Sequence, residues 1–402
     1  MGMRVLIVGV GTRGDVAPYT GLGVRLREAG HEVLVAAHAP YAALVTGAGL
    51  GYLELPGDPL FFLTGRFSVS AYKEYGGHLL DGLSAIAQRD ADVLLVGVAG
   101  ALGHHVAEAM GVPSMGVHLQ PIEPTGDFPP VLSMFRPSLG RWGNRRAARL
   151  AFEVPAAGPL IAGLSAPMRA RLGLAPMTPR DHYRRRESSR LPVFHGVSPL
   201  VLPRPADWRA GLEITGYWWA HRSAGWRPEP ELDDFLASGP APVYVGFGSL
   251  ADTRAERYTE LALKALRKAG LRGVVQTGAK GRLSDDVLAV GDVPHDWLFP
   301  RMAAVAHACG GGTTGSGVRA GVPAVALPVM NDQPFWAARL VALGVAPAAI
   351  PFRRVTPERL ATALTTAVTD PAYLRRAREL SAGVAAEDGA VPVIEAVNRL
   401  AT

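Results

Sequence analysis

A dense run of glycines, flanked by a histidine and by hydroxyl side chains, is the strongest chemical signal in the sequence. The stretch HACGGGTTGSGVRAGVP, residues 307–323, holds six glycines and two threonines between two apolar segments. Glycine costs conformational entropy in a folded domain, so this density favours close approach of a ligand to the backbone. Peptide N–H groups at a glycine-rich turn that enters a helix bind anions. We therefore predict a diphosphate site at Gly310, Gly311 and Gly312.

Polar side chains near this turn can complete the anion site. His307 ends the preceding strand, where its imidazole can donate a hydrogen bond to a phosphate oxygen. Gly248 and Ser249, at the end of another strand of the same half, offer a second contact with the anion. Hydroxyl groups come from Thr313, Thr314 and Ser316. The alternative for the same residues is a tight strand-to-helix turn beside a buried histidine.

A carboxylate and an amide stand together at the next strand-to-helix junction. Asp332 and Gln333 follow the apolar stretch PAVALPV and begin the helical pattern of residues 332–344. Vicinal sugar hydroxyls each donate and accept hydrogen bonds, and this pair can serve both needs. A simple helix cap by Asp332 is the alternative.

A second glycine-rich loop, GVGTRGDV, lies near the N-terminus. Gly9, Gly11 and Gly14 match the dinucleotide fingerprint G-x-G-x-x-G after a strand. That fingerprint also needs an acidic residue at the end of the second strand, but Glu32 stands at the beginning of HEVLVAAHA. A nicotinamide enzyme is therefore disfavoured. Asp15 follows the loop, either as the helix N-cap or as a general base.

Composition predicts a globular protein of two domains. The chain has 402 residues, of which 48% are hydrophobic and 19% charged, and its formal net charge is +6. The basic clusters at residues 141–149 and 180–190 are expected to be solvated, with attraction to anionic nucleotides or lipid headgroups as the alternative. Nucleic-acid binding is not expected, because no basic module interleaved with aromatic residues occurs.

Cysteine usage and the N-terminus predict a cytoplasmic protein. Cys309 is the single cysteine, so no internal disulfide can form. We expect no signal peptide, no membrane span and at most peripheral membrane contact, with a monomer or homodimer as the assembly. Metal chemistry is not predicted, because H-x-x-x-H and C-x-x-C spacings do not occur and Asp90-Ala91-Asp92 precedes a strand, at the end of the sheet away from ligands.

Strands and helices alternate in two separate parts of the chain. The first third contains strand patterns at residues 4–10, 31–39, 92–100 and 112–119, and the rhythm restarts at 242–250. This alternation is typical of an α/β fold with parallel, doubly wound sheets. We expect domains at 1–220 and 233–402, joined by a linker at 221–232, with loops and helices over 120–200. Ligands would then bind at the carboxyl ends of the strands, in a cleft between two facing sheets.

With these motifs in view, the chain resembles nucleotide-sugar-dependent glycosyltransferases of family 1, in the branch with antibiotic and sterol glycosyltransferases. The similar segments are RVLIVGVGTRGDVAPYTGLGVRLREAGHEV, EPTGDFPP, VYVGFGSL and residues 293–340. The resemblance implies the GT-B fold, in which two Rossmann-like domains face each other across a cleft and the last helix packs back on the first domain. It also implies an inverting, metal-independent transfer from a UDP- or dTDP-sugar to a lipophilic acceptor such as a polyketide, macrolide or sterol.

The resemblance also assigns roles to residues. His307 and Gly310–Thr314 would bind the diphosphate, Asp332 and Gln333 the sugar, and Asp15 would be the base. Val293 and His295 would lie beside the nucleotide base and ribose, and Arg13 would join the donor site. The acceptor candidates are Phe61, Phe62, Tyr72, His118, Gln120, Glu123 and Phe128. Ordinary packing explains these acceptor candidates equally well.

Two departures from the family pattern fall in the donor motif. Ala308 stands where the family usually has a second histidine, and Cys309 stands where it has a glycine. Three other functions stay open on the sequence: a nucleotide-sugar epimerase, a nicotinamide oxidoreductase, and a degenerate protein that only binds sugar nucleotides.

Overall fold

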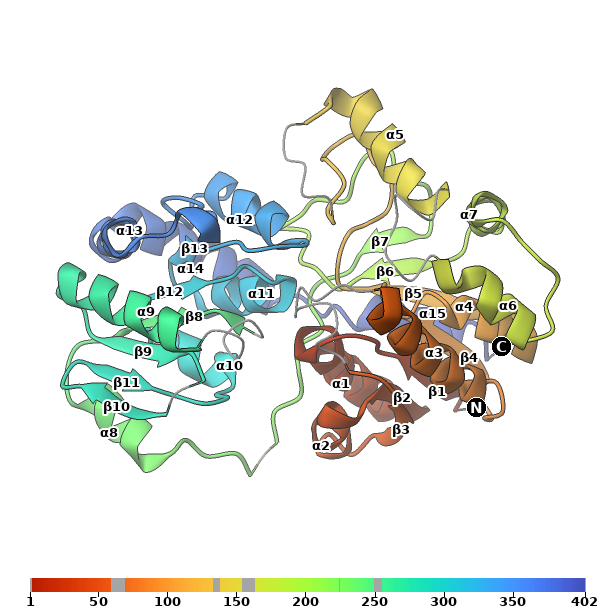
Figure 1. The fold of residues 1–402 in the computed structure, drawn as a ribbon, viewed down its shortest axis with the longest axis horizontal. Helices are drawn as coiled ribbons and strands as arrows, with labels where there is room; N and C mark the ends of the chain where they lie inside the picture. Colours follow the sequence, from red (N-terminus) through yellow and green to blue (C-terminus); the bar gives the residue numbers. More distant parts are fainter. Residues whose placement is uncertain are drawn as a thin grey trace. The chain divides into compact units, whose positions relative to one another are not determined.

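The computed structural model describes residues 2–58, 69–132, 138–153, 163–223, 225–248, 255–278 and 280–401. These residues form two compact units. One contains Met1–Ser223 together with Asp388–Thr402, and the other contains Ala224–Glu387. Each unit is built around its own parallel sheet (Figure 1).

The first unit has a seven-stranded sheet in the order β3-β2-β1-β4-β5-β6-β7. All of its neighbouring strands run parallel, and the order reverses between β1 and β4. The strands are β1 (Arg4–Val8), β2 (Glu32–His38), β3 (Gly51–Leu55), β4 (Val93–Val96), β5 (Ser114–His118), β6 (Val193–His195) and β7 (Leu212–Ile214). Ligands of such sheets bind where the order reverses, at the carboxyl ends of the strands.

Helices cover both faces of this sheet (Figure 1). They are α1 (Arg13–Glu28), η1 (Ala39–Tyr41), α2 (Ala42–Thr46), α3 (Val69–Ile86), α4 (Gly103–Met110), α5 (Gly140–Glu153), α6 (Ser165–Arg171), α7 (Pro179–Ser188) and the C-terminal α15 (Val391–Asn398). Helix α15 belongs to this unit although it is the last helix of the chain, because Val393 and Val397 are buried in the core that β1 and α1 share.

The second unit has a six-stranded sheet in the order β10-β11-β9-β8-β12-β13, in which only β10 is antiparallel. Its strands are β8 (Val243–Gly246), β9 (Gly273–Gln276), β10 (Gly281–Ser284), β11 (Val287–Ala289), β12 (Ala304–His307) and β13 (Ala324–Ala326). Its helices are α8 (Pro230–Ala237), α9 (Ala255–Ala269), α10 (His295–Leu298), η6 (Phe299–Arg301), α11 (Gly311–Ala320), α12 (Gln333–Ala342), η7 (Phe352–Arg354), α13 (Pro357–Thr369) and α14 (Pro371–Ala385).

The strand patterns of the sequence correspond to strands of the structure, including the three-residue β13 within PAVALPV, but the structure contains further strands. The stretch 120–200 was expected to hold loops and helices only, but β6 lies within it and extends the first sheet. The three residues of β6 are too few to show an alternating pattern, so alternation gives no signal there. Helix α8 begins at Pro230, inside the expected linker.

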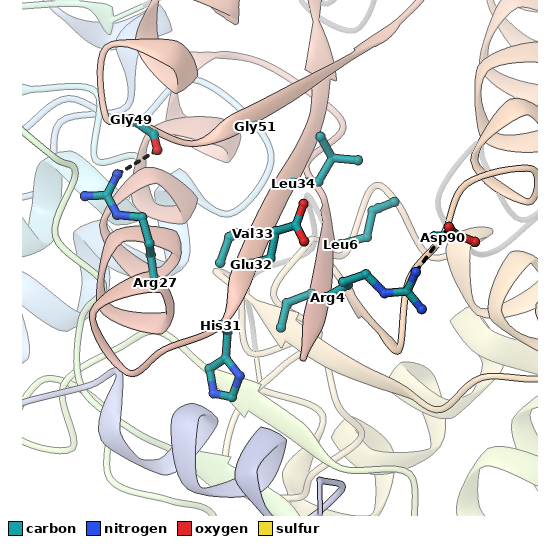
Figure 2. Close-up of a pocket in the computed structure, with 11 residues that line it drawn as sticks. Arg4, Leu6, Arg27, His31, Glu32, Val33, Leu34, Gly49, Gly51 and Asp90 are labelled. Carbon is teal, nitrogen blue, oxygen red and sulfur yellow. Dashed lines mark hydrogen bonds and ion pairs between the residues drawn. The ribbon is translucent and has the colours of Figure 1, made fainter. Parts of the chain in front are cut away.

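A hollow of about 300 Å³ lies by the amino ends of β1 and β2, at the end of the first sheet opposite the carboxyl ends of its strands (Figure 2). Arg4 lines it, pairs with Asp90 at 3.2 Å and donates to Asp92 at 2.7 Å. The D-x-D sequence therefore has a structural role, as expected for residues before a strand.

The described helices include none long and apolar enough to cross a membrane.

One close backbone contact in the first unit gives a stability prediction. A methyl group added at Gly21, on α1, would lie 1.7 Å from the Trp219 carbonyl oxygen. We expect Gly21→Ala to lower the free energy of unfolding by about 1–3 kcal/mol, the usual cost of overpacking. The control is Gly77→Ala on α3, where the added methyl meets no atom within 4 Å. That change should be neutral or stabilising by about 0.5–1 kcal/mol. Urea unfolding measures both, and equal stability of the two variants would contradict the contact.

Candidate functional site

The chemistry-bearing residues of the second unit gather at one edge of its sheet because its strands are in register. His307 ends β12 and pairs with Gly246 of β8 on one side and Ala326 of β13 on the other. The loops that follow these three strands therefore start at the same edge. They carry Gly248, the 310–314 turn, and Asp332 with Gln333.

A backbone hydrogen bond sets the proton position on His307. The Cys309 N–H donates to His307 Nδ1 at 3.0 Å, so the ring proton is on Nε2. That Nε2 is buried and has no hydrogen-bond partner among the described residues. Burial lowers the pKa of His307 to about 3, with a smaller contribution from His295. The imidazole is therefore neutral and presents an N–H donor rather than a positive charge.

The turn after His307 contains glycines that neither its backbone conformation nor the packing of the described residues requires. Gly310 is the N-cap of α11 and lacks a side-chain cap hydrogen bond. Neither Gly310 nor Gly312 has a left-handed φ, and a methyl group added at either would meet no atom within 4 Å. Thr314 Oγ1 is buried there without a partner among the described residues. The helix N-terminus thus presents N–H groups and open space together, which suits an anion.

Asp332 and Gln333 are held firmly at the start of α12. Asp332 stands at the N-cap position, but its side chain accepts the Trp336 indole N–H at 2.8 Å instead of capping the helix. The Gln333 side-chain oxygen accepts the N–H groups of Val329 and Met330 at 2.8 and 3.1 Å. Its Nε2 is therefore directed away from these contacts and keeps two donors.

The other donor candidates lie around the same sheet edge or outside the described residues. His295 begins α10, and its ring stacks on Phe299 with centroids 4.2 Å apart. Val293 is half-buried just before that helix, and Gly248 is exposed with a φ of +58°. Ser249 lies outside the described residues, and Arg13 is exposed at the first position of α1 in the first unit.

In the first unit, the glycine-rich loop after β1 holds Asp15. The helix N-cap is Thr12 rather than Asp15, which is the third residue of α1. Asp15 Oδ2 accepts the Thr12 N–H at 2.9 Å and its hydroxyl at 3.1 Å, while Oδ1 faces Gln120 Nε2 at 3.5 Å. Burial raises the pKa of Asp15 despite these hydrogen bonds. Asp15 is therefore not the N-cap that the sequence offered as an alternative, and its hydrogen bonds to Thr12 and Gln120 lower its pKa by less than burial raises it.

The acceptor candidates divide into three groups. Gln120 is half-buried beside Asp15, Tyr72 is half-buried on α3, and Phe128 packs against a small core with Trp208. His118 and Glu123 lie in the interior, where Glu123 Oε2 accepts from Arg186 at 2.5 Å. Phe61 and Phe62 lie outside the described residues.

Sequence reasoning missed two residues that hold the loop after β5. Asp207 accepts the Thr125 hydroxyl at 2.6 Å and the Gly126 N–H at 2.8 Å. Arg186 was grouped with solvated arginines of residues 180–190, but it is buried against Glu123. These contacts have no sequence signal, because the partners are 63 to 82 positions apart.

Family profiles match both parts of the chain. Residues 5–76 match the N-terminal domain of glycosyltransferase family 28, and residues 275–400 match the C-terminal domain of erythromycin biosynthesis protein CIII-like proteins. The chain is 38% identical to an O-mycaminosyltylonolide 6-deoxyallosyltransferase of Streptomyces fradiae, over 96% of this chain and 95% of that protein. It is 30% identical to a sterol 3-beta-glucosyltransferase of Arabidopsis thaliana, over 99% of this chain and 68% of that protein.

Solved structures share the fold along the whole chain. The kitacinnamycin glycosyltransferase aligns with a TM-score of 0.74 and 21% identity, covering 100% of this chain and 99% of the other. The glycosyltransferase VinC, in complex with dTDP, aligns with a TM-score of 0.65 and 22% identity, covering 99% of both chains. These neighbours confirm two parallel-sheet α/β domains of the GT-B type.

The state of His307 is directly measurable. We expect its imidazole to remain the neutral Nε2–H form from pH 8 to pH 5, because burial depresses its pKa to about 3. Its contribution to stability is complete above about pH 6.5, where the unfolded chain is also neutral, and is lost as the pH falls toward 3. Side-chain ¹⁵N NMR of the labelled protein measures the tautomer. Titration of this histidine near pH 6.5 would contradict the assignment.

Proposed function

The chain belongs to the family of GT-B-fold glycosyltransferases that includes macrolide and sterol glycosyltransferases, and on this premise we propose the details of its reaction. It transfers a sugar, with inversion, from a dTDP- or UDP-sugar to a hydroxyl group of a lipophilic small molecule. The observation that carries the proposal is the buried, unpartnered His307 Nε2–H at the end of β12, together with the bare backbone of Gly310 and Gly312 in the turn that follows. That arrangement supplies donors without any acceptor.

The donor's diphosphate is bound by uncharged groups in this proposal. Negative charge grows on the diphosphate as the bond to the sugar breaks. Peptide N–H groups at the start of α11, together with His307 Nε2–H and the Thr313 and Thr314 hydroxyls, stabilise that charge. These groups are in place before the reaction, so they need not reorganise during it. The transfer itself then requires no metal ion.

The rest of the donor is assigned to the neighbouring loops. Asp332 and Gln333 bind sugar hydroxyls, and their fixed side chains favour one orientation of the ring. Val293 and His295 lie beside the nucleotide base and ribose. Gly248, Ser249 and Arg13 complete the donor contacts. A dTDP complex exists for VinC, which supports a dTDP-sugar over a UDP-sugar.

Asp15 is the proposed base. A raised pKa makes its carboxylate a better proton acceptor for a hydroxyl group. The acceptor oxygen then attacks the anomeric carbon as Asp15 takes its proton, the diphosphate leaves from the opposite face, and the configuration inverts. Gln120 holds the second carboxylate oxygen, so the base keeps one orientation.

The acceptor is assigned by relationship and by the character of the candidate residues. The relative from Streptomyces fradiae is named for a macrolide acceptor and a 6-deoxyhexose, so we propose a macrolide-like aglycone, with a sterol as the second choice. Tyr72, Gln120 and Phe128 are the described candidates for contact with it. The single cysteine is buried and unpaired, which supports a cytoplasmic location.

The bare glycines give a test that separates binding from folding. An added methyl in Gly312→Ala meets no protein atom, so the fold should be retained while the methyl occupies space assigned to the diphosphate. We expect dTDP binding, measured by calorimetry, to weaken at least tenfold. The matched control is Gly77→Ala, which also adds a methyl in open space on a helix and should bind dTDP normally. Unchanged binding by Gly312→Ala would refute the diphosphate site.

The base assignment has a separate test. In Asp15→Asn, the amide oxygen can still accept from Thr12, so the start of α1 is retained. We expect turnover to fall about 10²–10⁴-fold, the usual contribution of a general base, with dTDP affinity unchanged. The wild-type rate should rise with pH through the raised pKa of Asp15 and then level off, a rise that the variant lacks. Turnover within threefold of wild type would restrict Asp15 to its helix-start role.

A further inference from the structure

We propose that His118, Glu123 and His195 form a buried binding site for one divalent transition-metal ion, with Zn²⁺ as the best match. Their ligand atoms all lie within 4.8 Å of one another, and no other group of three such side chains occurs in the part of the chain that the structure describes. All three residues are almost fully buried. The site is structural, and all three of its residues belong to the first unit.

The sheet brings the two histidines together. His118 ends β5 and His195 ends β6, and the two residues pair directly across these parallel strands. Their rings meet edge to face with centroids 5.5 Å apart. Glu123 comes from the loop that follows β5, and its Oε1 lies 3.7 Å from His118 Nδ1. Two strand ends and one loop thus converge on one point.

The polarity of His195 favours a cation. His195 Nδ1 lies 2.9 Å from the Glu213 carbonyl oxygen, so Nδ1 carries the proton and Nε2 presents a lone pair. A second-shell carbonyl contact of this kind orients histidine ligands in metal sites.

Each of the three residues has a polar atom without a partner. His118 Nδ1, Glu123 Oε1 and His195 Nε2 are buried and have no hydrogen-bond partner among the described residues. Buried polar atoms in native proteins are nearly always satisfied by protein, water or an ion. One water molecule satisfies all three atoms only when His118 carries its proton on Nδ1. With that proton on Nε2, three lone pairs converge, and a metal ion binds all of them. Neutral nitrogen ligands with one carboxylate select Zn²⁺ over Mg²⁺ or Ca²⁺.

Arg186 shapes the site and limits its affinity. It donates to Glu123 Oε2 at 2.5 Å, which leaves Oε1 on the side of His118. Its positive charge opposes a dication, so we expect weaker binding than at an all-thiolate site. Zn²⁺ bonds of about 2.0–2.1 Å at tetrahedral angles place ligand atoms about 3.3 Å apart. The 3.7 Å between His118 Nδ1 and Glu123 Oε1 therefore needs to close by a few tenths of an ångström, and the widest spacing in the cluster, up to 4.8 Å, by as much as about 1.5 Å.

A metal here would brace the loop that supports the proposed base. Gln120, which contacts Asp15, lies between His118 and Glu123 in the chain. Fixing both sides of Gln120 restricts its movement relative to Asp15. Metal binding is measured without turnover, so its failure would leave the proposed glycosyl transfer untouched, and a failure of that transfer would leave this site untouched.

The experiment uses the full chain and a matched histidine control. Protein treated with chelator is titrated with Zn²⁺ and Co²⁺, and bound metal is measured by mass spectrometry, cobalt absorption and the shift in Tm. The variants are His195→Gln and His38→Gln. His38 also ends a strand, contacts a carbonyl oxygen through Nδ1 and has an unpartnered Nε2, but it lies outside the cluster.

We expect the wild type and His38→Gln to bind about one ion per chain with a tetrahedral cobalt spectrum and a raised Tm. His195→Gln should lose the stoichiometric ion, and Glu123→Gln serves in its place if that variant does not fold. The proposal is overturned if the wild type takes up no Zn²⁺ or Co²⁺ at micromolar free metal. It is also overturned if His195→Gln and His38→Gln bind equally, which would assign the cluster to buried water.

Discussion

The proposed donor site in the second unit depends on one hydrogen bond, from the Cys309 N–H to His307 Nδ1. It leaves the ring proton on Nε2, so the buried edge of the imidazole is a donor. Cys309 adopts a left-handed φ of +62° to make this turn, a conformation that side chains other than glycine and asparagine rarely adopt. The backbone N–H of a strained residue thereby makes the free nitrogen of His307 a donor. This contact does not involve the side chain at position 308, so Ala308 in place of a second histidine does not affect it.

Histidines end four of the parallel strands, and their partners decide what each can bind. His38, His195 and His307 each use Nδ1 for a backbone contact and bury an unpartnered Nε2. The contact is a carbonyl oxygen for His38 and His195, so Nδ1 carries the proton and the free Nε2 presents a lone pair. It is an N–H for His307, so the free nitrogen is a donor. The same residue at the same place in the fold therefore suits a cation in one unit and an anion in the other.

The sequence predicts a feature well when the residues that form it are close together in the chain, and poorly when they are far apart. The strand, turn and helix of 307–323 were predictable because they are contiguous, and two parallel α/β sheets follow from the long alternating patterns. The GT-B fold was implied by the family resemblance, and the solved structures confirm it. The metal cluster was not predictable, since its ligands at 118, 123 and 195 have no ligand spacing and meet only through strand pairing. Arg186 was misplaced for the same reason, because only its buried carboxylate partner distinguishes it from the solvated arginines of its helix.

The two glycine-rich loops of the chain show why a motif alone does not define an anion site. After β1, Asp15 accepts the Thr12 N–H, and a methyl group at Gly11 would lie 2.5 Å from Asp15 Oδ2. That loop is filled by its own carboxylate, so an anion would meet like charge at the helix start. After β12, no side chain caps α11, and Gly310 and Gly312 face open space. One loop therefore holds a buried carboxylate and the other holds hydrogen-bond donors, which is the pair of opposite properties that the proposed reaction assigns to its base and to its diphosphate site.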